Sequence, residues 1–184
     1  MQPEREVPQN SAHQDLICHR VEAVPTMSKP AQTLTIVSYH PKYREAFFDL
    51  NEAWLEQHFL LEPYDIKVLR NPEKMILEPG GEVYFGLIGE EVVATFALTP
   101  RKEGVMELNK MAVRDDQRSK GFGNQLMIHL ISLCQKRGLN TIELYSHTSL
   151  ESAVYLYRKF GFREIPMPPD CVYDRANIRM ELTI

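Results

Sequence analysis

The pattern of apolar and polar residues from residue 33 onward predicts strands that pair in an antiparallel sheet. A short β-branched run over residues 33–38 suits a first strand. Apolar residues then alternate with polar ones along 82–88 and again along 91–98. The Gly89-Glu90 pair between these two runs is typical of a tight turn, so the two strands form a predicted hairpin.

A third strand follows a predicted turn at residues 100–104. Residues 105–113 alternate regularly but carry apolar side chains on both faces. That pattern favours a strand that is covered on both sides over one that lies on the surface. The polar residues 114–117 then break the pattern and end the strand.

Two helices are predicted before the hairpin, over about residues 42–58 and 64–70. Within the first, Tyr43, Phe47, Leu50 and Trp54 share one face. We interpret this aromatic stripe as core packing, because large rings bury more apolar area than other side chains do.

The second half of the chain alternates helices and strands. A helix is predicted through residues 124–137, ending before Gly138, and a strand follows at 141–145. Thr148 and Glu151 have the spacing of a capping box and predict a second helix that ends at Gly161. Alternation over 176–182 predicts a last strand. The expected fold class is therefore α/β (α+β), with helices on both faces of a mixed sheet.

Composition indicates a single domain over residues 33–184. The chain of 184 residues is 43% hydrophobic, enough for one core. Residues 1–32 hold four prolines among polar residues and are predicted to be a flexible extension without chemistry. The net charge of −4 gives no basic field for nucleic acid or for an anionic membrane.

The cysteines and histidines argue for a reduced protein without a metal. Cys18, Cys134 and Cys171 are odd in number and scattered, so disulfides are not expected. The six histidines show no ligand spacing, and no structural metal is predicted. No apolar run reaches the length of a membrane span and no secretory leader is evident, so a cytoplasmic location is expected.

The segment between the third predicted strand and the long helix indicates an anion site. Gly121 and Gly123 lack a Cβ, so several backbone N–H groups could converge on one anion at the start of the helix. Arg118 and Lys120 would add positive charge there. A Gly-x-Gly pair alone is a weak signal and also fits an ordinary tight turn. Neither the P-loop pattern nor the three-glycine dinucleotide pattern is present.

Two motifs give the chain a resemblance to the GNAT acetyltransferase superfamily. Arg118-x-x-Gly121-x-Gly123 resembles its acyl-CoA signature, and residues 153–162 resemble its Ala-x-x-Leu-Tyr-x-x-x-Gly-Phe segment. The similarity covers about residues 33–184. One departure is Leu150, where the family often has an asparagine that reaches the cofactor. That contact is lost or passes to Ser146 or Ser149.

The resemblance implies acetyl-CoA as cosubstrate, held between two neighbouring strands that diverge. It implies that the backbone of Met111, Ala112 and Val113 pairs with the pantetheine arm. The diphosphate would be held by the loop and the first helical turn, that is by Arg118, Ser119, Lys120, Gly121, Phe122, Gly123 and Asn124.

The resemblance also implies two catalytic residues. Glu107 lies eleven residues before Arg118 and matches the strand glutamate that removes a proton from the amine, directly or through water, in some family members. A solvated or salt-bridged glutamate is the alternative. Tyr157 matches the tyrosine that protonates the departing thiolate, and a core tyrosine is its alternative.

Several residues are weaker candidates on the acceptor side. His58, Glu62 and Tyr64 follow the first helix, which walls the acceptor pocket in this family. Asn109 and Lys110 could stabilise an oxyanion, although a backbone N–H fills that role more often. Arg175 and Asn177 could bind an acceptor carboxylate, or Arg175 could form a surface ion pair.

The predicted function is acetyl transfer from acetyl-CoA to a primary amine by direct attack in a ternary complex. The acceptor is expected to be a small molecule or amino-acid-like, and the protein a monomer or homodimer. Three alternatives stay open: a protein or peptide N-acetyltransferase, an acyl-CoA-binding module without activity, and a structural subunit of a larger complex.

Overall fold

The structure is a computed structural model that describes residues 32–171 and 173–184. The predicted N-terminal extension therefore lies outside the described residues except for Gln32, and Cys18 lies outside them too. Gln32 itself is fixed by helix α3 (Phe122–Lys136), because its carbonyl accepts a hydrogen bond of 2.9 Å from the Gln125 side chain. The same side chain accepts a 2.8 Å bond from the Leu34 N–H, so one glutamine ties the start of the described chain to that helix.

The described residues form a mixed sheet of seven strands in the order β1-β2-β3-β4-β5-β7-β6. The strands are β1 (Thr35–Ser38), β2 (Glu82–Ile88), β3 (Glu91–Lys102), β4 (Val105–Val113), β5 (Thr141–Ser146), β6 (Arg163–Ile165) and β7 (Ile178–Thr183). Strands β1 to β4 are antiparallel, β4 and β5 are parallel, and β7 is antiparallel to both β5 and β6. The predicted α/β class with an antiparallel first half is confirmed.

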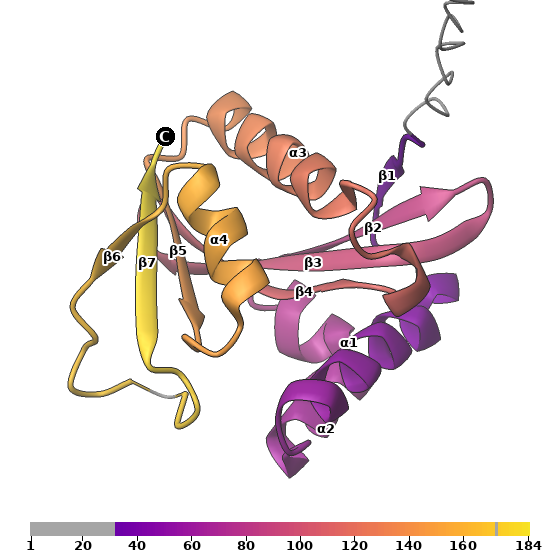
Figure 1. Cartoon of the computed structure of the whole chain (residues 1–184), viewed down its shortest axis with the longest axis horizontal. Helices are drawn as coiled ribbons and strands as arrows, with labels where there is room; N and C mark the ends of the chain where they lie inside the picture. Colours follow the sequence, from indigo (N-terminus) through magenta and orange to yellow (C-terminus); the bar gives the residue numbers. More distant parts are fainter. Residues whose placement is uncertain (1–31, 172) are drawn as a thin grey trace, which may run out of the picture. The chain divides into compact units, whose positions relative to one another are not determined.

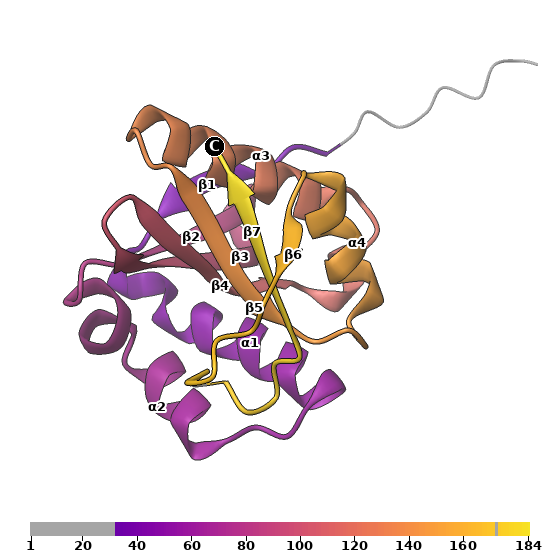
Figure 2. The same ribbon diagram turned by 90° about the vertical axis from the view of Figure 1, so that its left-hand side faces the viewer.

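Helices cover both faces of the sheet, as predicted (Figure 1; Figure 2). Helices α1 (Arg44–His58) and α2 (Pro63–Arg70) lie on one face, and α3 (Phe122–Lys136) and α4 (Glu151–Lys159) lie on the other. Each face has its own apolar core. None of the described helices combines the length and the apolar character needed to cross a membrane.

The aromatic stripe on α1 packs in the core, as predicted. Phe47 is fully buried, and the rings of Phe47 and Tyr43 both contact Phe85 of β2. Trp54 is only partly buried and lines the cavity described below. The stripe therefore fixes α1 against the sheet and brings its C-terminal end to the site.

Strand β3 is longer than predicted, because Pro100 does not end it. The register between β3 and β4 shifts between Pro100 and Lys102, which is a β-bulge. A proline is tolerated in a strand at such a bulge. The expected turn is therefore confined to the two residues after Lys102, and Arg101 lies on the strand.

Two further predictions differ from the structure. The three-residue strand β6 was not predicted, because it is too short to give a period. The capping box at Thr148 is wrong: α4 begins at Glu151 without a side-chain cap. Thr148 instead donates its N–H to Asn177 Oδ1 at 2.8 Å and accepts a 2.9 Å bond from Asn177 Nδ2. The partner of Thr148 is thus 29 residues away in sequence.

Candidate active site

Strands β4 and β5 pair at one end and diverge at the other. They pair only where Val105, Met106 and Glu107 face residues 141–143. Beyond Glu107, none of the described residues of β5 pairs with β4, and Figure 1 shows the two strands running apart. Backbone N–H and C=O groups normally find partners. The β5-facing edge of residues 108–113 can therefore accept an extended ligand such as the pantetheine arm, and this edge includes the predicted Met111, Ala112 and Val113.

A bulge in β4 shapes the same edge. Thr95 faces Ala112 but Ala97 faces Asn109, so β4 carries one extra residue there. Lys110 has φ of 51°, the left-handed region that non-glycine residues rarely adopt. The bulge directs the Lys110 ammonium to Asp65 of α2, 3.3 Å away.

The loop before α3 has the geometry of an anion cradle. Ser119 and Gly121 both have left-handed backbones, with φ of 60° and 85°. Gly121 is the N-cap of α3 and no side chain caps the helix there. The first N–H groups of a helix have no partner within the helix, so they are available to an anion. A Cβ on Gly121 would meet no atom within 4 Å, so the space beside the loop is open.

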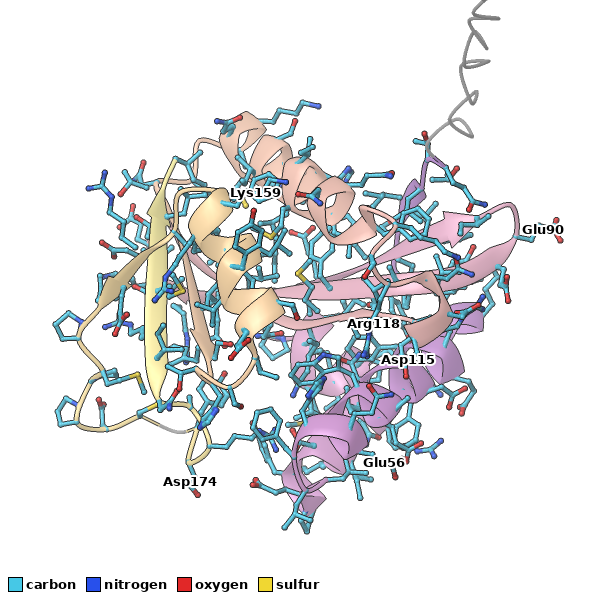
Figure 3. All side chains as sticks on the ribbon, viewed as in Figure 1. Glu56, Glu90, Asp115, Arg118, Lys159 and Asp174 are labelled. Atoms are coloured by element: carbon cyan, nitrogen blue, oxygen red, sulfur yellow. The ribbon has the colours of Figure 1, made fainter. Side chains whose placement is uncertain are left out.

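The two predicted cations of this loop are engaged within the protein. Arg118 donates to the Val113 carbonyl at 3.2 Å and to Gln57 Oε1 at 2.8 Å, and it forms an ion pair with Asp115. Figure 3 shows Arg118 and Asp115 next to α1. Lys120 donates to Gln117 at 2.9 Å. Arg118 therefore anchors the loop to β4 and α1.

A cation that the sequence analysis missed lies at the start of α3. Lys159, near the end of α4, donates to Asn124 Oδ1 at 2.6 Å. Asn124 is in the first turn of α3, so this contact brings an ammonium to the open N–H groups. Gly123 allows the close approach of the two helices, since a Cβ there would lie 3.2 Å from Leu156 of α4.

A cavity of about 350 Å³ lies beside these strands. Glu107, Tyr157 and Met111 line it together with the weaker candidates Glu62, Tyr64, Asn109, Lys110 and Arg175. His58 and Asn177 are not among its lining residues: His58 packs on Trp54, and Asn177 pairs with Thr148. The structure thus brings both predicted catalytic residues to one cavity.

Glu107 is buried in a network of donors. It is 1% exposed, and its Oε1 accepts hydrogen bonds from Tyr173 at 2.6 Å and from Asn109 Nδ2 at 3.4 Å. Its Oε2 forms an ion pair with Arg101. Glu107 is thus salt-bridged, which is one form of the alternative to a catalytic base that the sequence left open.

A second buried carboxylate lies directly beside Glu107. Glu143 of β5 is its register partner and is itself 5% exposed. Like charges at facing positions destabilise a sheet. Each carboxylate has its own arginine here, Arg101 for Glu107 and Arg179 for Glu143, the latter at 2.8 Å. The two ion pairs keep this half of the sheet electrically balanced.

Tyr157 is half-buried on α4, and burial raises its pKa to about 12. At neutral pH it is therefore a phenol and can donate a proton. Leu150, at the position where the family often has asparagine, is buried and lines the cavity. Ser146 also lines the cavity, whereas Ser149 contacts the His147 ring.

Both predicted oxyanion donors are engaged elsewhere. Asn109 Nδ2 donates to Thr99 at 2.9 Å, and Lys110 pairs with Asp65. Burial lowers the pKa of Lys110, although the Asp65 charge opposes that effect. The side chains of Asn109 and Lys110 therefore support the shape of the cavity, which leaves a backbone N–H as the better donor to an oxyanion.

Arg101, Tyr173 and Asp65 are site residues that the sequence analysis missed. Arg101 sits on the unexpected end of β3, Tyr173 on a loop without periodicity, and Asp65 on a short helix. Nothing in their local sequence marks them, because each enters the site through a contact with a distant residue. Among the described residues, no group of three or more His, Cys, Asp or Glu side chains could hold a metal ion.

Comparison with known proteins identifies the family of the chain. Residues 40–162 match the acetyltransferase (GNAT) family. The uncharacterized N-acetyltransferase YvbK of Bacillus subtilis is 33% identical over 105 residues, which span 55% of this chain and 68% of that protein. The ribosomal protein bS18-alanine N-acetyltransferase of Escherichia coli K12 is 35% identical over 94 residues, which span 50% of this chain and 64% of that protein.

Solved structures have the same fold. A GNAT-family acetyltransferase from Staphylococcus aureus Mu50 superposes with a TM-score of 0.73 at 24% identity, covering 82% of this chain and 98% of that chain. A Bacillus subtilis acetyltransferase in complex with CoA superposes with a TM-score of 0.63 at 25% identity, covering 82% and 99%. The diverging strands and the glycine loop thus belong to an acetyltransferase fold. The chain is a member of the GNAT acetyltransferase family.

Proposed function

We propose that this protein transfers the acetyl group of acetyl-CoA to a primary amine of a small or amino-acid-like acceptor, by direct attack in a ternary complex. The observation that carries the proposal is the single cavity, about 350 Å³, that Glu107, Tyr157 and the edge of β4 share. A cavity of this size is at the small end of ligand pockets. It suits a compact amine or the first residue of a chain.

The acetyl-CoA site would consist mainly of backbone groups. The edge of β4 at Met111, Ala112 and Val113 would hold the pantetheine arm. The loop and first turn from Arg118 to Asn124 would hold the diphosphate, with Lys159 as an added cation. Fixed backbone groups position a substrate with little dependence on side-chain type.

The two catalytic side chains would move protons at opposite ends of the reaction. Bound acetyl-CoA supplies a thioester that an unprotonated amine can attack. Because an ammonium has no lone pair, Glu107 would take one proton from the acceptor nitrogen. Tyr157 would give a proton to the departing sulfur. The nitrogen would lose its second proton as the amide forms, and that proton would restore the Tyr157 phenol through solvent.

A protein α-amine is the second candidate acceptor. Its support is the similarity to a relative whose name states that it acts on the alanine of a ribosomal protein. The cavity would then receive only the first residue, and the rest of the acceptor chain would lie outside it. Tyr64 is exposed and lines the cavity, and the exposed Leu60 accepts a bond on its carbonyl from the lining residue Arg175, so both could contact such a chain.

A two-stage experiment separates these possibilities. Isothermal titration first measures acetyl-CoA binding, and a thiol-release assay then tests L-alaninamide, L-lysine, putrescine, benzylamine and an alanine-initiated peptide. Turnover of free amines supports the small acceptor, and turnover of the peptide alone supports the protein acceptor. Binding without turnover on any of them would contradict the enzyme assignment and leave a binding module. Absence of binding would reject the acetyl-CoA site.

A further inference from the structure

The Tyr173 side chain lies between the Glu107 carboxylate and the cavity. Glu107 is 1% exposed, and its Oε2 is fully buried beside Arg101. Its Oε1 is covered by the Tyr173 hydroxyl, which donates a 2.6 Å hydrogen bond to it. Tyr173 is half-exposed and lines the cavity. An acceptor nitrogen in the cavity would therefore reach the phenol oxygen before it could reach the carboxylate.

The surroundings of Tyr173 fix its ring and keep its proton. Its ring centroid lies 5.1 Å from that of Tyr145, and the Arg101 guanidinium lies 5.8 Å from the Tyr173 ring. Burial, followed by the negative charge of Glu107, raises the pKa of Tyr173. A phenol that remains protonated can accept a proton on its lone pair while it donates its own.

We propose that Tyr173 relays a proton from the acceptor ammonium to Glu107, so that the buried carboxylate acts as base without touching the substrate. This inference rests on the proposed function. In the step, an N–H bond of the ammonium breaks as the Tyr173 oxygen takes the proton. The Tyr173 O–H bond breaks as Glu107 Oε1 takes the other proton. Nitrogen keeps the electron pair, Tyr173 ends as a phenol, and Glu107 ends as a carboxylic acid that returns its proton after the product leaves.

The test compares Tyr173→Phe, Glu107→Gln and the double variant, with the panel amine that gives the highest kcat/KM. Tyr173→Phe keeps the ring and removes only the relay atom. At pH 7 we expect kcat/KM to fall about a hundred-fold, with the Kd for acetyl-CoA unchanged. The deficit should shrink as the pH approaches the acceptor's own pKa, about 8 for an α-amine, because a free amine needs no relay. The double variant should be no slower than the slower single variant, since the two residues act as a unit.

Several outcomes would overturn the relay. They are full kcat/KM in Tyr173→Phe, a deficit that stays constant across pH, and losses that multiply in the double variant. If Tyr173→Phe does not fold, rates of the native enzyme in mixtures of H₂O and D₂O decide. A step that moves two protons gives a curved plot of rate against the fraction of D₂O. A straight plot contradicts the relay. A native enzyme that binds acetyl-CoA but acetylates no panel amine would instead reject the proposed function itself.

Discussion

Arg175 donates hydrogen bonds of 2.7 and 2.8 Å to the two carboxylate oxygens of Asp65, across 110 residues of sequence. Asp65 is on α2, and Arg175 is on the loop before β7 that also carries Tyr173. Lys110, on the β4 bulge, pairs with the same carboxylate. One buried aspartate therefore connects three separate walls of the cavity. Because Asp65 already holds the guanidinium, Arg175 is a poor choice for binding an acceptor carboxylate.

We predict that Asp65→Asn destabilises the fold by about 3 kcal/mol. The variant leaves two cations, Arg175 and Lys110, without the carboxylate that compensates them. The free energy of unfolding in urea measures the effect. The matched control is Glu45→Gln, which breaks the exposed pair between Arg70 and Glu45 and should change stability little. Equal effects of the two substitutions would contradict the buried role of Asp65.

The stability difference between the native protein and Asp65→Asn should depend on pH. Burial opposes ionisation of Asp65, but the hydrogen bonds from Arg175 and the charge of Lys110 outweigh it and lower the pKa of Asp65. A group with a lowered folded pKa stabilises the fold above its unfolded pKa, about 3.9 for aspartate. The difference should be constant from pH 7 to about pH 4 and shrink at more acid pH. A difference that grows on acidification would show that the carboxylate is not the stabilising form.

Gly121→Val should weaken CoA binding by more than about tenfold. Its left-handed φ of 85° is strained for a β-branched residue, and the side chain would enter the open space beside the loop. Gly138→Val is the control. Gly138 also has a left-handed φ, of 68°, and open surroundings, but it lies at the other end of α3. Isothermal titration should show normal CoA affinity for that variant; equal losses would mean that backbone strain alone is the cause.

Tyr157→Phe should lower turnover roughly a hundred-fold, at the low end for general acid catalysis because a thiolate leaves readily. The affinity for acetyl-CoA should stay nearly unchanged. Tyr155→Phe, on the same helix and 70% exposed, is the control and should keep full turnover. If Tyr157→Phe lost affinity and turnover to the same extent, its role would be packing rather than proton donation.

Regular patterns in the sequence predicted the architecture well. Alternation located β2 and the start of β3, and the α1 stripe identified Phe47 and Leu50 as core residues because a period reports which side of an element is buried. The errors fall where partners are distant. Thr148 takes its partner from Asn177 instead of forming a local capping box, and Pro100 is accommodated by a bulge that depends on its neighbour β4.

The sequence by itself determined the fold class, the family resemblance and the residues carried by local motifs, from Glu107 to Tyr157. These follow from spacing along one element or one loop, which a linear chain records directly. Only the tertiary structure decided how the Glu107 carboxylate is surrounded. Arg101 reaches Glu107 through a bulge, Tyr173 through a loop, and Asp65 joins α2 to Lys110 and Arg175. Such contacts arise from the packing of distant segments, so no local period or motif encodes them.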